Sequence, residues 1–340
     1  MRKLLNTLYI TSPDSYLSRD GLNVVVLTDN KERFRIPILN IESIITMGYT
    51  GASPSLMRLC SENNVSISFL SNQGKFISRV NGPIKGNVIL RMSQFKSATS
   101  KECTSNLCKI IIAGKIQNYR NILQRYLRDY GANLEVENAS ERLYRIRNSV
   151  LSVEDIDVLR GLEGEAAASY FSVFNFLILN RDNTFSFNGR NKRPPKDPVN
   201  AMLSFVYTLL ASEVQSALET VGLDPYVGFL HTLRPGRASL ALDLMEELRA
   251  YMGDRLVLSI INRKQISAKD FVFQDSDNIL MTDKTKKEIL NSWQKRKQDI
   301  ITHPYLNEQI PIGLLPYTQA LLLARYLRGD LDNYPVFISK

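Results

Sequence analysis

Cysteine, histidine and tryptophan are scarce in this chain of 340 residues, which has three, two and one of them, respectively. An odd number of cysteines without CxxC spacing argues against a disulfide framework and against a structural zinc site. Cys60, Cys103 and Cys108 instead fit a protein of the reducing cytosol. Of the two histidines, His303 lies in THPYL without an acidic neighbour and is expected to be structural, which leaves His231 as the candidate for chemistry.

Long hydrophobic runs are also missing. The longest, such as YFSVFNFLIL at residues 170–179, have about ten residues, half of the roughly 20 that a helix needs to cross a bilayer. The N-terminal MRKLLNTLYI has a short apolar run, but polar residues follow at once and no small-residue cleavage site is present. We therefore expect neither a signal peptide nor a membrane span, and a cytoplasmic protein.

The charge balance is basic. The chain has 43 Lys and Arg against 34 Asp and Glu, a formal net charge of +9. Such an excess suits a polyanionic partner such as nucleic acid, although many basic proteins bind none. With 44% hydrophobic residues the chain can build a sizeable core, and its length suggests two domains.

Apolar patterns and turn signals divide the chain into a strand-rich part and a helical part. The expected strands are residues 4–10, 23–27, 34–39, 43–47, 65–69 and 76–80, with a short helix at 53–61. The expected longer helices are residues 106–130, 152–179, 198–220, 239–252, 283–299 and 315–328. The predicted fold class is therefore α+β, with a small β-rich N-terminal domain (1–92) and a larger all-helical domain (106–340). The polar residues 93–105 between them fit a linker or the onset of the next helix.

Residues 228–249, GFLHTLRPGRASLALDLMEELR, form the most informative segment. Asp243 and Glu246 are three residues apart, so on a helix they share one face beside a leucine stripe that repeats every four residues. Two carboxylates beside a buried stripe repel each other and need a positive partner. A divalent metal, ligated by carboxylate oxygens and a neutral His231, satisfies that need. Taken alone, the segment fits a solvated acidic helix edge with a core histidine nearby equally well.

Another candidate acid lies in residues 152–174, SVEDIDVLRGLEGEAAASYFSVF. Glu163 falls in the apolar row of this helix, whereas Glu165 is about 200° around and points elsewhere. A buried carboxylate is costly unless it is paired or bound to a metal, and the small residues after Glu163 leave room for a partner. A Glu–Arg pair in a helical core is the alternative that this segment leaves open.

Three motifs, in this order, resemble one protein family. They are GLEGEAAASYF, FNGRNKRPPKDPVNAMLSFVY and GFLHTLRPGRASLALDLMEELR. The family is CRISPR-associated endonuclease one. CRISPR is an antiviral defence, and this family is its adaptation integrase, which inserts new spacers into a CRISPR array. Stretches near both ends of the chain fit it as well, and among its subtypes the chain is most similar to the type I-C version. The resemblance covers most of the chain and implies the same two-domain fold.

The resemblance implies a catalytic metal site made of Glu163, His231 and Glu246. The helical argument selects Glu163 over Glu165 by itself, but the residues alone do not choose between Asp243 and Glu246. Asp243 is expected to tune the ligands or to hold a second ion. Oxygen-rich ligation favours Mg²⁺ or Mn²⁺, and the single imidazole tilts the choice toward Mn²⁺. Such an ion would help a DNA 3′-hydroxyl, or water, to attack a phosphodiester.

Several further residues are candidates for DNA contacts or for positions near the site. Arg234 and Arg237 follow His231 in a loop and are expected to contact phosphates, unless they pair with the acidic edge of the next helix. Arg190 and Arg193 could clamp DNA or belong to a solvated charged loop. Asn200 and Tyr207 resemble family positions near the site, although Asn200 could cap its helix and Tyr207 could be core.

The resemblance also implies partners. They are double-stranded DNA, as prespacer and as CRISPR repeat, and a second copy of this chain in a homodimer formed largely through the N-terminal domains. Two such dimers would flank a central dimer of the small companion, CRISPR-associated protein two, in a hetero-hexamer. Two other functions remain open: a metal-dependent DNA-repair nuclease without an integration role, and a non-catalytic DNA-binding protein whose buried acids are merely paired.

Overall fold

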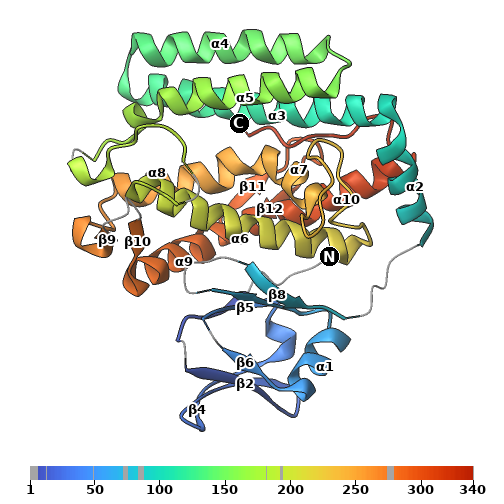
Figure 1. The fold of residues 1–340 in the computed structure, drawn as a ribbon, viewed down its shortest axis with the longest axis vertical. Helices are drawn as coiled ribbons and strands as arrows, with labels where there is room; N and C mark the ends of the chain where they lie inside the picture. Colours follow the sequence, from blue (N-terminus) through green and yellow to red (C-terminus); the bar gives the residue numbers. More distant parts are fainter. Residues whose placement is uncertain are drawn as a thin grey trace. The chain divides into compact units, whose positions relative to one another are not determined.

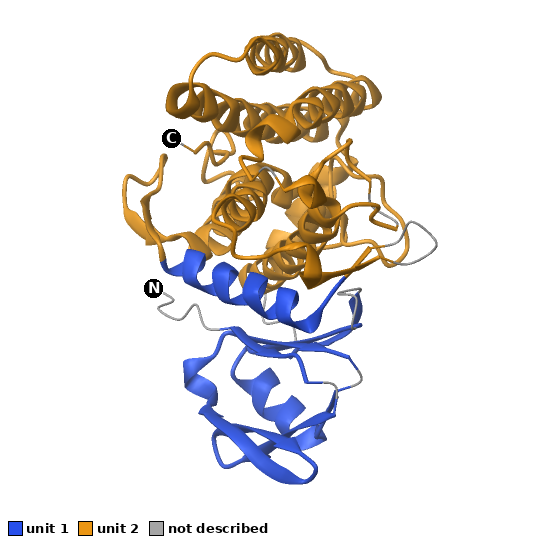
Figure 2. Ribbon diagram, turned by 90° about the vertical axis from the view of Figure 1, so that its left-hand side faces the viewer, with its two compact units in different colours: residues 1–85, 281–298 blue, residues 86–280, 299–340 orange. Residues whose placement is uncertain are grey.

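The structure is a computed structural model that describes residues 7–12, 14–48, 50–71, 76–82, 88–180, 182–191, 194–273 and 279–339. Figure 2 shows its two compact units. Unit 1 comprises residues 1–85 and 281–298, and unit 2 comprises residues 86–280 and 299–340. The strand-rich N-terminal region and the mainly helical remainder confirm the α+β fold class.

The first of two four-stranded sheets in the described part of unit 1 has the order β1-β5-β7-β8. In it β1 (Thr7–Ile10), β5 (Ser43–Met47) and β7 (Ser66–Leu70) run parallel, and β8 (Phe76–Val80) joins β7 antiparallel. The central strands β5 and β7 are apolar and buried along most of their length, as expected for parallel strands that are covered on both faces.

The second sheet has the order β4-β3-β2-β6. Its strands are β4 (Lys31–Pro37), β3 (Asn23–Thr28), β2 (Ser15–Asp20) and the two-residue β6 (Gly51–Ala52). Inner-facing residues of this sheet share one core with β5, β7 and helix α1 (Pro54–Glu62). The sequence did not predict β2, because its residues SYLSRD are mostly polar.

Helices dominate unit 2 (Figure 1). They are α2 (Val88–Thr99), α3 (Lys101–Tyr130), α4 (Leu134–Leu151), α5 (Ile156–Ser172), α6 (Pro198–Val221), α7 (Ser239–Leu248), α8 (Arg255–Asn262) and α10 (Leu315–Leu327). A π-helical turn, Arg249–Asp254, joins α7 to α8. Helix α3 packs against α4, α5 and α7, and α6 packs against α7 and α10, so α3 and α6 form the frame on which the other helices are arranged.

Three sequence-based expectations need correction. Residues 93–105 are helical, because α2 covers 88–99 and Ser100 caps α3 by accepting a hydrogen bond from Cys103 N at 3.3 Å. Helix α9 (Asp283–Gln298) belongs to unit 1, where its Gln294 donates to the carbonyl of Thr7 at 2.9 Å.

The region after residue 106 is also not purely helical. It contains two short strand pairs, β9 (Phe271–Phe273) with β10 (Ile279–Met281) and β11 (Ile300–Thr302) with β12 (Gln309–Pro311). Each of these strands has three residues, too few to show a periodic pattern in the sequence.

Helix α6 is long and apolar enough, by length and composition, to cross a membrane. In this fold 56% of its most apolar window is buried inside the protein. Its N-cap Asp197 accepts from Asn200 N at 2.7 Å, and its C-cap Gly222 has a left-handed backbone. These features are typical of a core helix of a folded domain.

Candidate functional site

His231, in the loop before α7, is hydrogen-bonded to Asp243 of α7. The carboxylate of Asp243 is fully buried and accepts hydrogen bonds from the backbone N–H groups of Phe229, Leu230 and His231 at 2.6, 3.0 and 2.9 Å. Its Oδ1 also lies 2.6 Å from Nδ1 of His231. With the carboxylate as acceptor, Nδ1 carries the imidazole proton, and Nε2 keeps a free lone pair.

Gly228 makes this close approach possible. A Cβ atom at this position would lie 2.7 Å from Oδ2 of Asp243 and 2.7 Å from the backbone carbon of Ser239. Any larger residue would push the loop away from α7, so the glycine that opens the GFLH motif is a steric requirement of the His231–Asp243 contact.

One buried ammonium joins two carboxylates that come from different helices. Lys115 on α3 contacts Oε1 of Glu163 on α5 and lies 2.7 Å from Oε2 of Glu246 on α7. The side chains of Lys115 and Glu246 are 2% and 4% exposed, whereas that of Glu163 is 28% exposed. The structure therefore brings together Glu163 and Glu246, which the sequence analysis predicted to share one site. They meet around Lys115, which the sequence analysis did not single out.

Glu246 is held ionised by its surroundings. Arg249 lies 2.9 Å from its Oε1, whereas Lys115 contacts its Oε2. Burial alone raises the pKa of Glu246, but the charges of Arg249 and Lys115 outweigh it and lower the pKa to about 2. Oε2 of Glu246 forms an ion pair with Lys115, but it accepts no hydrogen bond from any residue that the structure describes.

The imidazole completes this arrangement. Nε2 of His231 lies 3.9 Å from Oε1 of Glu246. His231 and Glu163 line the same cavity of about 210 Å³, with Arg160, Leu230, Thr232 and Arg237 as the other lining residues. Two of the three predicted ligands, Glu163 and His231, thus line one small space, and the third, Glu246, lies 3.9 Å from the imidazole of His231.

The donor set has the right chemistry for a divalent ion, with two carboxylates and one imidazole whose Nε2 lies 3.9 Å from Glu246. In their present positions, however, no three Asp, Glu, His or Cys side chains of the described residues are grouped so that they hold a metal. The cation on which Glu163 and Glu246 converge is the ammonium of Lys115. Glu163 and Glu246 therefore hold a positive charge in this structure, and carboxylates of this kind are ligands that suit Mg²⁺ or Mn²⁺.

Lys115 carried a detectable sequence signal. It lies in the apolar row of α3, four residues after Ile111 and four before Tyr119, and all three are buried. The rule that selected Glu163, a charged residue within a helical apolar stripe, selects Lys115 as well.

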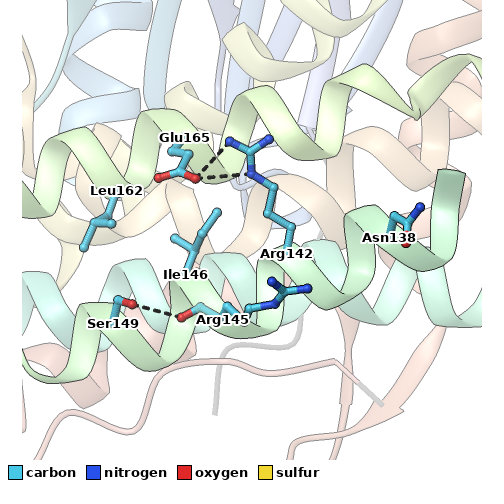
Figure 3. A pocket seen from close by; sticks show the side chains of 7 residues that line it. All are labelled: Asn138, Arg142, Arg145, Ile146, Ser149, Leu162 and Glu165. Carbon is cyan, nitrogen blue, oxygen red and sulfur yellow. Dashed lines mark hydrogen bonds and ion pairs between the residues drawn. The ribbon is translucent and has the colours of Figure 1, made fainter.

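Glu165 points away from the site, as the helical spacing predicted. It is 43% exposed and forms an ion pair at 3.0 Å with Arg142 of α4. Figure 3 shows these two side chains pointing toward each other in the groove between α4 and α5. This groove of about 510 Å³ does not include Glu163, so the two neighbouring glutamates serve opposite sides of α5.

Tyr207 belongs to a polar cluster rather than to a plain apolar core. It is 8% exposed, and its hydroxyl donates to Oδ1 of Asp254 at 2.5 Å. The guanidinium groups of Arg249 and Arg190 lie 4.8 and 5.4 Å from its ring centroid. The π-helical turn between α7 and α8 supplies both Arg249 and Asp254, which connects this cluster to Glu246.

Arg190 and the buried Asn200 form one hydrogen-bonded cluster. Arg190 donates to Oδ1 of Asn200 at 2.6 Å and to the hydroxyl of Ser204 at 3.0 Å, and Asn200 donates to the carbonyl of Gly189 at 2.9 Å. The guanidinium of Arg190 is thus engaged within the protein, which does not fit a DNA clamp. Asn200 does not cap α6, because Asp197 does. Arg193 lies outside the described residues.

Arg234 and Arg237 are not paired with the acidic edge of α7. Neither side chain makes an ion pair or hydrogen bond with any residue that the structure describes, and Arg237 lines the cavity beside His231. The acids that could have paired with them are engaged elsewhere, Asp243 with the loop backbone and Glu246 with Lys115 and Arg249. Both guanidinium groups are available to an anionic ligand.

Comparison with known proteins shows the family. A family model described as CRISPR associated protein Cas1 matches residues 8–295. Two similar relatives are CRISPR-associated endonuclease Cas1 2 of Rhodospirillum rubrum, 49% identical over 100% of both chains, and CRISPR-associated endonuclease Cas1 1 of Chlorobaculum tepidum, 46% identical over 99% of both. The chain therefore belongs to the Cas1 family, as its motifs predicted.

Solved structures agree on the fold. A CAS1 protein from Thermotoga maritima matches with a TM-score of 0.83 at 23% identity, over 98% of this chain and 100% of that one. A casposase bound to its integration product matches with a TM-score of 0.83 at 22% identity, over 97% of this chain and 94% of that one. The assignment to the type I-C subtype is not tested by these matches and stays a prediction.

Proposed function

We propose that this protein is a metal-dependent DNA integrase and endonuclease of CRISPR adaptation. The observation that carries the proposal is the convergence of Glu163 and Glu246, from two helices, on one buried cation beside the oriented imidazole of His231. Relatives at 49% and 46% identity are named CRISPR-associated endonucleases, which supports the same chemistry here.

The reaction is transesterification. A 3′-hydroxyl of the prespacer attacks a phosphodiester of the CRISPR repeat, a new phosphodiester forms, and the repeat strand leaves with a free 3′-hydroxyl. The number of phosphodiester bonds does not change, so joining requires no nucleotide cofactor. Water in place of the 3′-hydroxyl gives simple cleavage by the same site. When bound, Mg²⁺ or Mn²⁺ would polarise the phosphoryl oxygen and lower the pKa of the attacking hydroxyl.

The residues of the chain have separable tasks in this reaction. Glu163, Glu246 and Nε2 of His231 would hold the ion. Asp243 keeps the proton on Nδ1 of His231, so that Nε2 remains a ligand. Arg249 keeps Glu246 ionised while it is buried.

The cavity also suits a phosphate. Arg237 lines it, and Arg234 lies on the same loop, both without a partner among the described residues. A phosphodiester that enters beside His231 would lie next to Arg237, and Arg234 is three residues away on the same loop. The cation is held at the site by acids, and the DNA backbone is held at its entrance by arginines.

We further propose the partners that this reaction requires. Insertion of a spacer needs two joining events at opposite ends of one repeat, which one active site cannot reach, so we expect a homodimer on each side of a Cas2 dimer. A solved structure described as a Cas6-RT-Cas1--Cas2 complex contains a chain of the same fold, with a TM-score of 0.82 at 21% identity over 98% of this chain and 36% of that chain. Its description names Cas2 as a partner of that protein, which supports the same partner here. Because its proposed DNA substrate lies in the cytoplasm, we expect the protein there.

Replacement of the proposed ligands tests the function. Glu163→Ala, His231→Ala and Glu246→Ala should each lower joining of a labelled prespacer to repeat DNA by at least about 100-fold in Mg²⁺ or Mn²⁺. Glu165→Ala, two residues from Glu163 but on the other side of α5, should retain activity. Cleaved but never joined DNA would favour a repair nuclease, and near-normal activity of His231→Ala would refute the metal site.

A further inference from the structure

Lys115 occupies the space between the two glutamates that are proposed to hold a metal. Its ammonium contacts Oε1 of Glu163 and lies 2.7 Å from Oε2 of Glu246. These are the carboxylates that a divalent ion would have to bind. Because the side chain of Lys115 is 2% exposed, its charge has no ready escape to solvent.

Four charged side chains that contact one another are electrically balanced. The two carboxylates of Glu163 and Glu246 face two cations, Lys115 and Arg249, so the formal charges of this cluster of four sum to zero. A divalent ion added to this cluster would leave an excess of two positive charges in a poorly solvated place, where like charges repel strongly. Without the lysine, the same cluster carries one net negative charge and would attract the ion.

The packing of Lys115 restrains it, since its ammonium lies 5.6 Å from the ring centroid of Tyr119, which stacks on Tyr170 at 3.9 Å. Displacement of the ammonium therefore has to be driven by the incoming ion.

We propose that Lys115 is a built-in competitor for the metal, an internal cation that holds Glu163 and Glu246 together in the metal-free protein and weakens the binding of the divalent ion. This inference rests on the proposed metal site. It makes Lys115 a positioning residue whose removal has two opposite effects. The metal-free protein becomes less stable, and its affinity for the ion rises.

Direct measurement of Mn²⁺ binding tests the competition. The free Mn²⁺ signal in electron paramagnetic resonance, titrated with purified full-length protein, gives the dissociation constant without any DNA. Lys115→Gln should bind Mn²⁺ at least about tenfold more tightly than the unaltered protein, a coupling of ordinary size between two sites. Its melting temperature should fall in EDTA and rise further on Mn²⁺ addition than that of the unaltered protein. Equal or weaker Mn²⁺ binding by Lys115→Gln would overturn the inference.

Lys109 supplies a matched control on the same helix. It pairs with the exposed Glu154 at 2.6 Å, outside the cavity, so Lys109→Gln should leave Mn²⁺ binding unchanged. If Lys115→Gln does not fold with or without Mn²⁺, the comparison moves to Lys115→Met, which keeps a long side chain without its charge. Lys115→Met should bind Mn²⁺ more tightly than the unaltered protein, and equal binding would refute the competition.

The same titration separates this inference from the proposed function. Binding of Mn²⁺ that is lost in His231→Ala but unchanged in Lys115→Gln keeps the metal site and rejects the competitor. Binding that is the same in the unaltered protein, His231→Ala and Glu246→Ala rejects the metal site itself, and the inference with it.

Discussion

Asp243 lies fully buried against His231, with 2.6 Å between its Oδ1 and Nδ1 of the imidazole. Three backbone N–H groups of the preceding loop donate to the same carboxylate. A carboxylate has about four lone-pair positions, and all of them are used here. Asp243 therefore has no free oxygen for an ion, and we infer that it orients His231 instead of holding a second metal.

Asp243→Asn tests this assignment. The amide keeps the shape but has one acceptor oxygen, so its NH₂ group faces backbone donors and His231 loses its fixed orientation. We expect Mn²⁺ affinity and the joining rate to fall by about 10- to 100-fold, as is usual when the partner of a metal-binding histidine is removed. Asp129→Asn, at an exposed aspartate beside Arg125 and Arg128, is the control. Unaltered Mn²⁺ affinity in Asp243→Asn would contradict the orienting role.

Arg234 and Arg237 should supply part of the DNA affinity. Each phosphate contact adds about 0.9 to the slope of log affinity against log salt, because DNA binding releases counterions. Arg234→Ala and Arg237→Ala should each weaken binding of unrelated duplexes and lower this slope by about one, measured by fluorescence anisotropy between 50 and 200 mM salt. Arg58→Ala, at an exposed arginine paired with Glu62 in unit 1, should change neither. A slope that stays the same in both loop variants would exclude them as phosphate contacts.

Much of the fold could be read from local sequence patterns. The bounds of β5 and β8 agree with the predicted strands, and α6 differs from its prediction by one residue, since these segments are apolar and bounded by strong turn or cap signals. Helix α4 was not predicted. Its N-cap is Asn133, whose side chain accepts a hydrogen bond from Val136 N at 3.1 Å. Its long polar surface weakened the apolar period on which the prediction depended.

The site was only partly predictable. Helical periodicity identified the inward-facing Glu163, which is a local property. The role of Asp243 depends on backbone N–H groups more than ten residues away, and the contact of Lys115 joins α3 to α5 and α7. The orientation of Arg249 depends on a π-helical turn, which helical periodicity does not reveal. Such contacts are set by tertiary packing, which spacing along the chain does not encode.

Asn118 ties the C-terminal tail to the helices of the site. Its amide donates to the carbonyls of Glu247 and Phe337, both at 2.8 Å, and its oxygen accepts from Ser339 N at 2.8 Å. Asn118→Ala leaves these buried groups unpaired, at about 1–3 kcal/mol each, so the free energy of unfolding should fall by about 3 kcal/mol or more in urea. Asn148→Ala, at an exposed position on α4, is the control. A change below about 1 kcal/mol for Asn118→Ala would show that the tail is not held by this residue.

Asp254 should make stability depend on pH. Burial raises its pKa from the ordinary value of 3.8 to about 6, against the hydrogen bond from Tyr207 and the charge of Arg249. Between these pH values the folded protein binds more protons than the unfolded chain, so this contribution to stability is full below about pH 4 and is lost as the pH rises to about 6. The shift corresponds to about 3 kcal/mol.

Asp254→Asn isolates this contribution. The difference in free energy of unfolding between the unaltered protein and the variant, from urea titrations at pH 4, 5, 6 and 7, should fall by about 2–3 kcal/mol across the series. Asp332→Asn, at an exposed position, should give a difference that does not change with pH. A flat difference for Asp254→Asn would mean that Asp254 is ionised in the folded protein over this whole range.

The chain should be a homodimer in solution. The proposed spacer insertion needs two joining events and hence more than one active site, and exposed sheet edges in unit 1 can pair with a second copy. Edge strand β4 exposes Phe34 (47%), and edge strand β8 exposes Ile77 (55%). Light scattering should give a mass near twice 38.7 kDa.

Phe34→Glu and Ile77→Glu then locate the interface, because a buried charge in the pair of edges would dissociate the dimer. At least one of them should sediment as a monomer, and Phe176→Glu, at a 39% exposed position in unit 2, should remain a dimer. A monomer of the unaltered chain at micromolar concentration, with or without DNA, would contradict the proposed assembly. A dimer that survives both unit 1 substitutions would place the interface elsewhere.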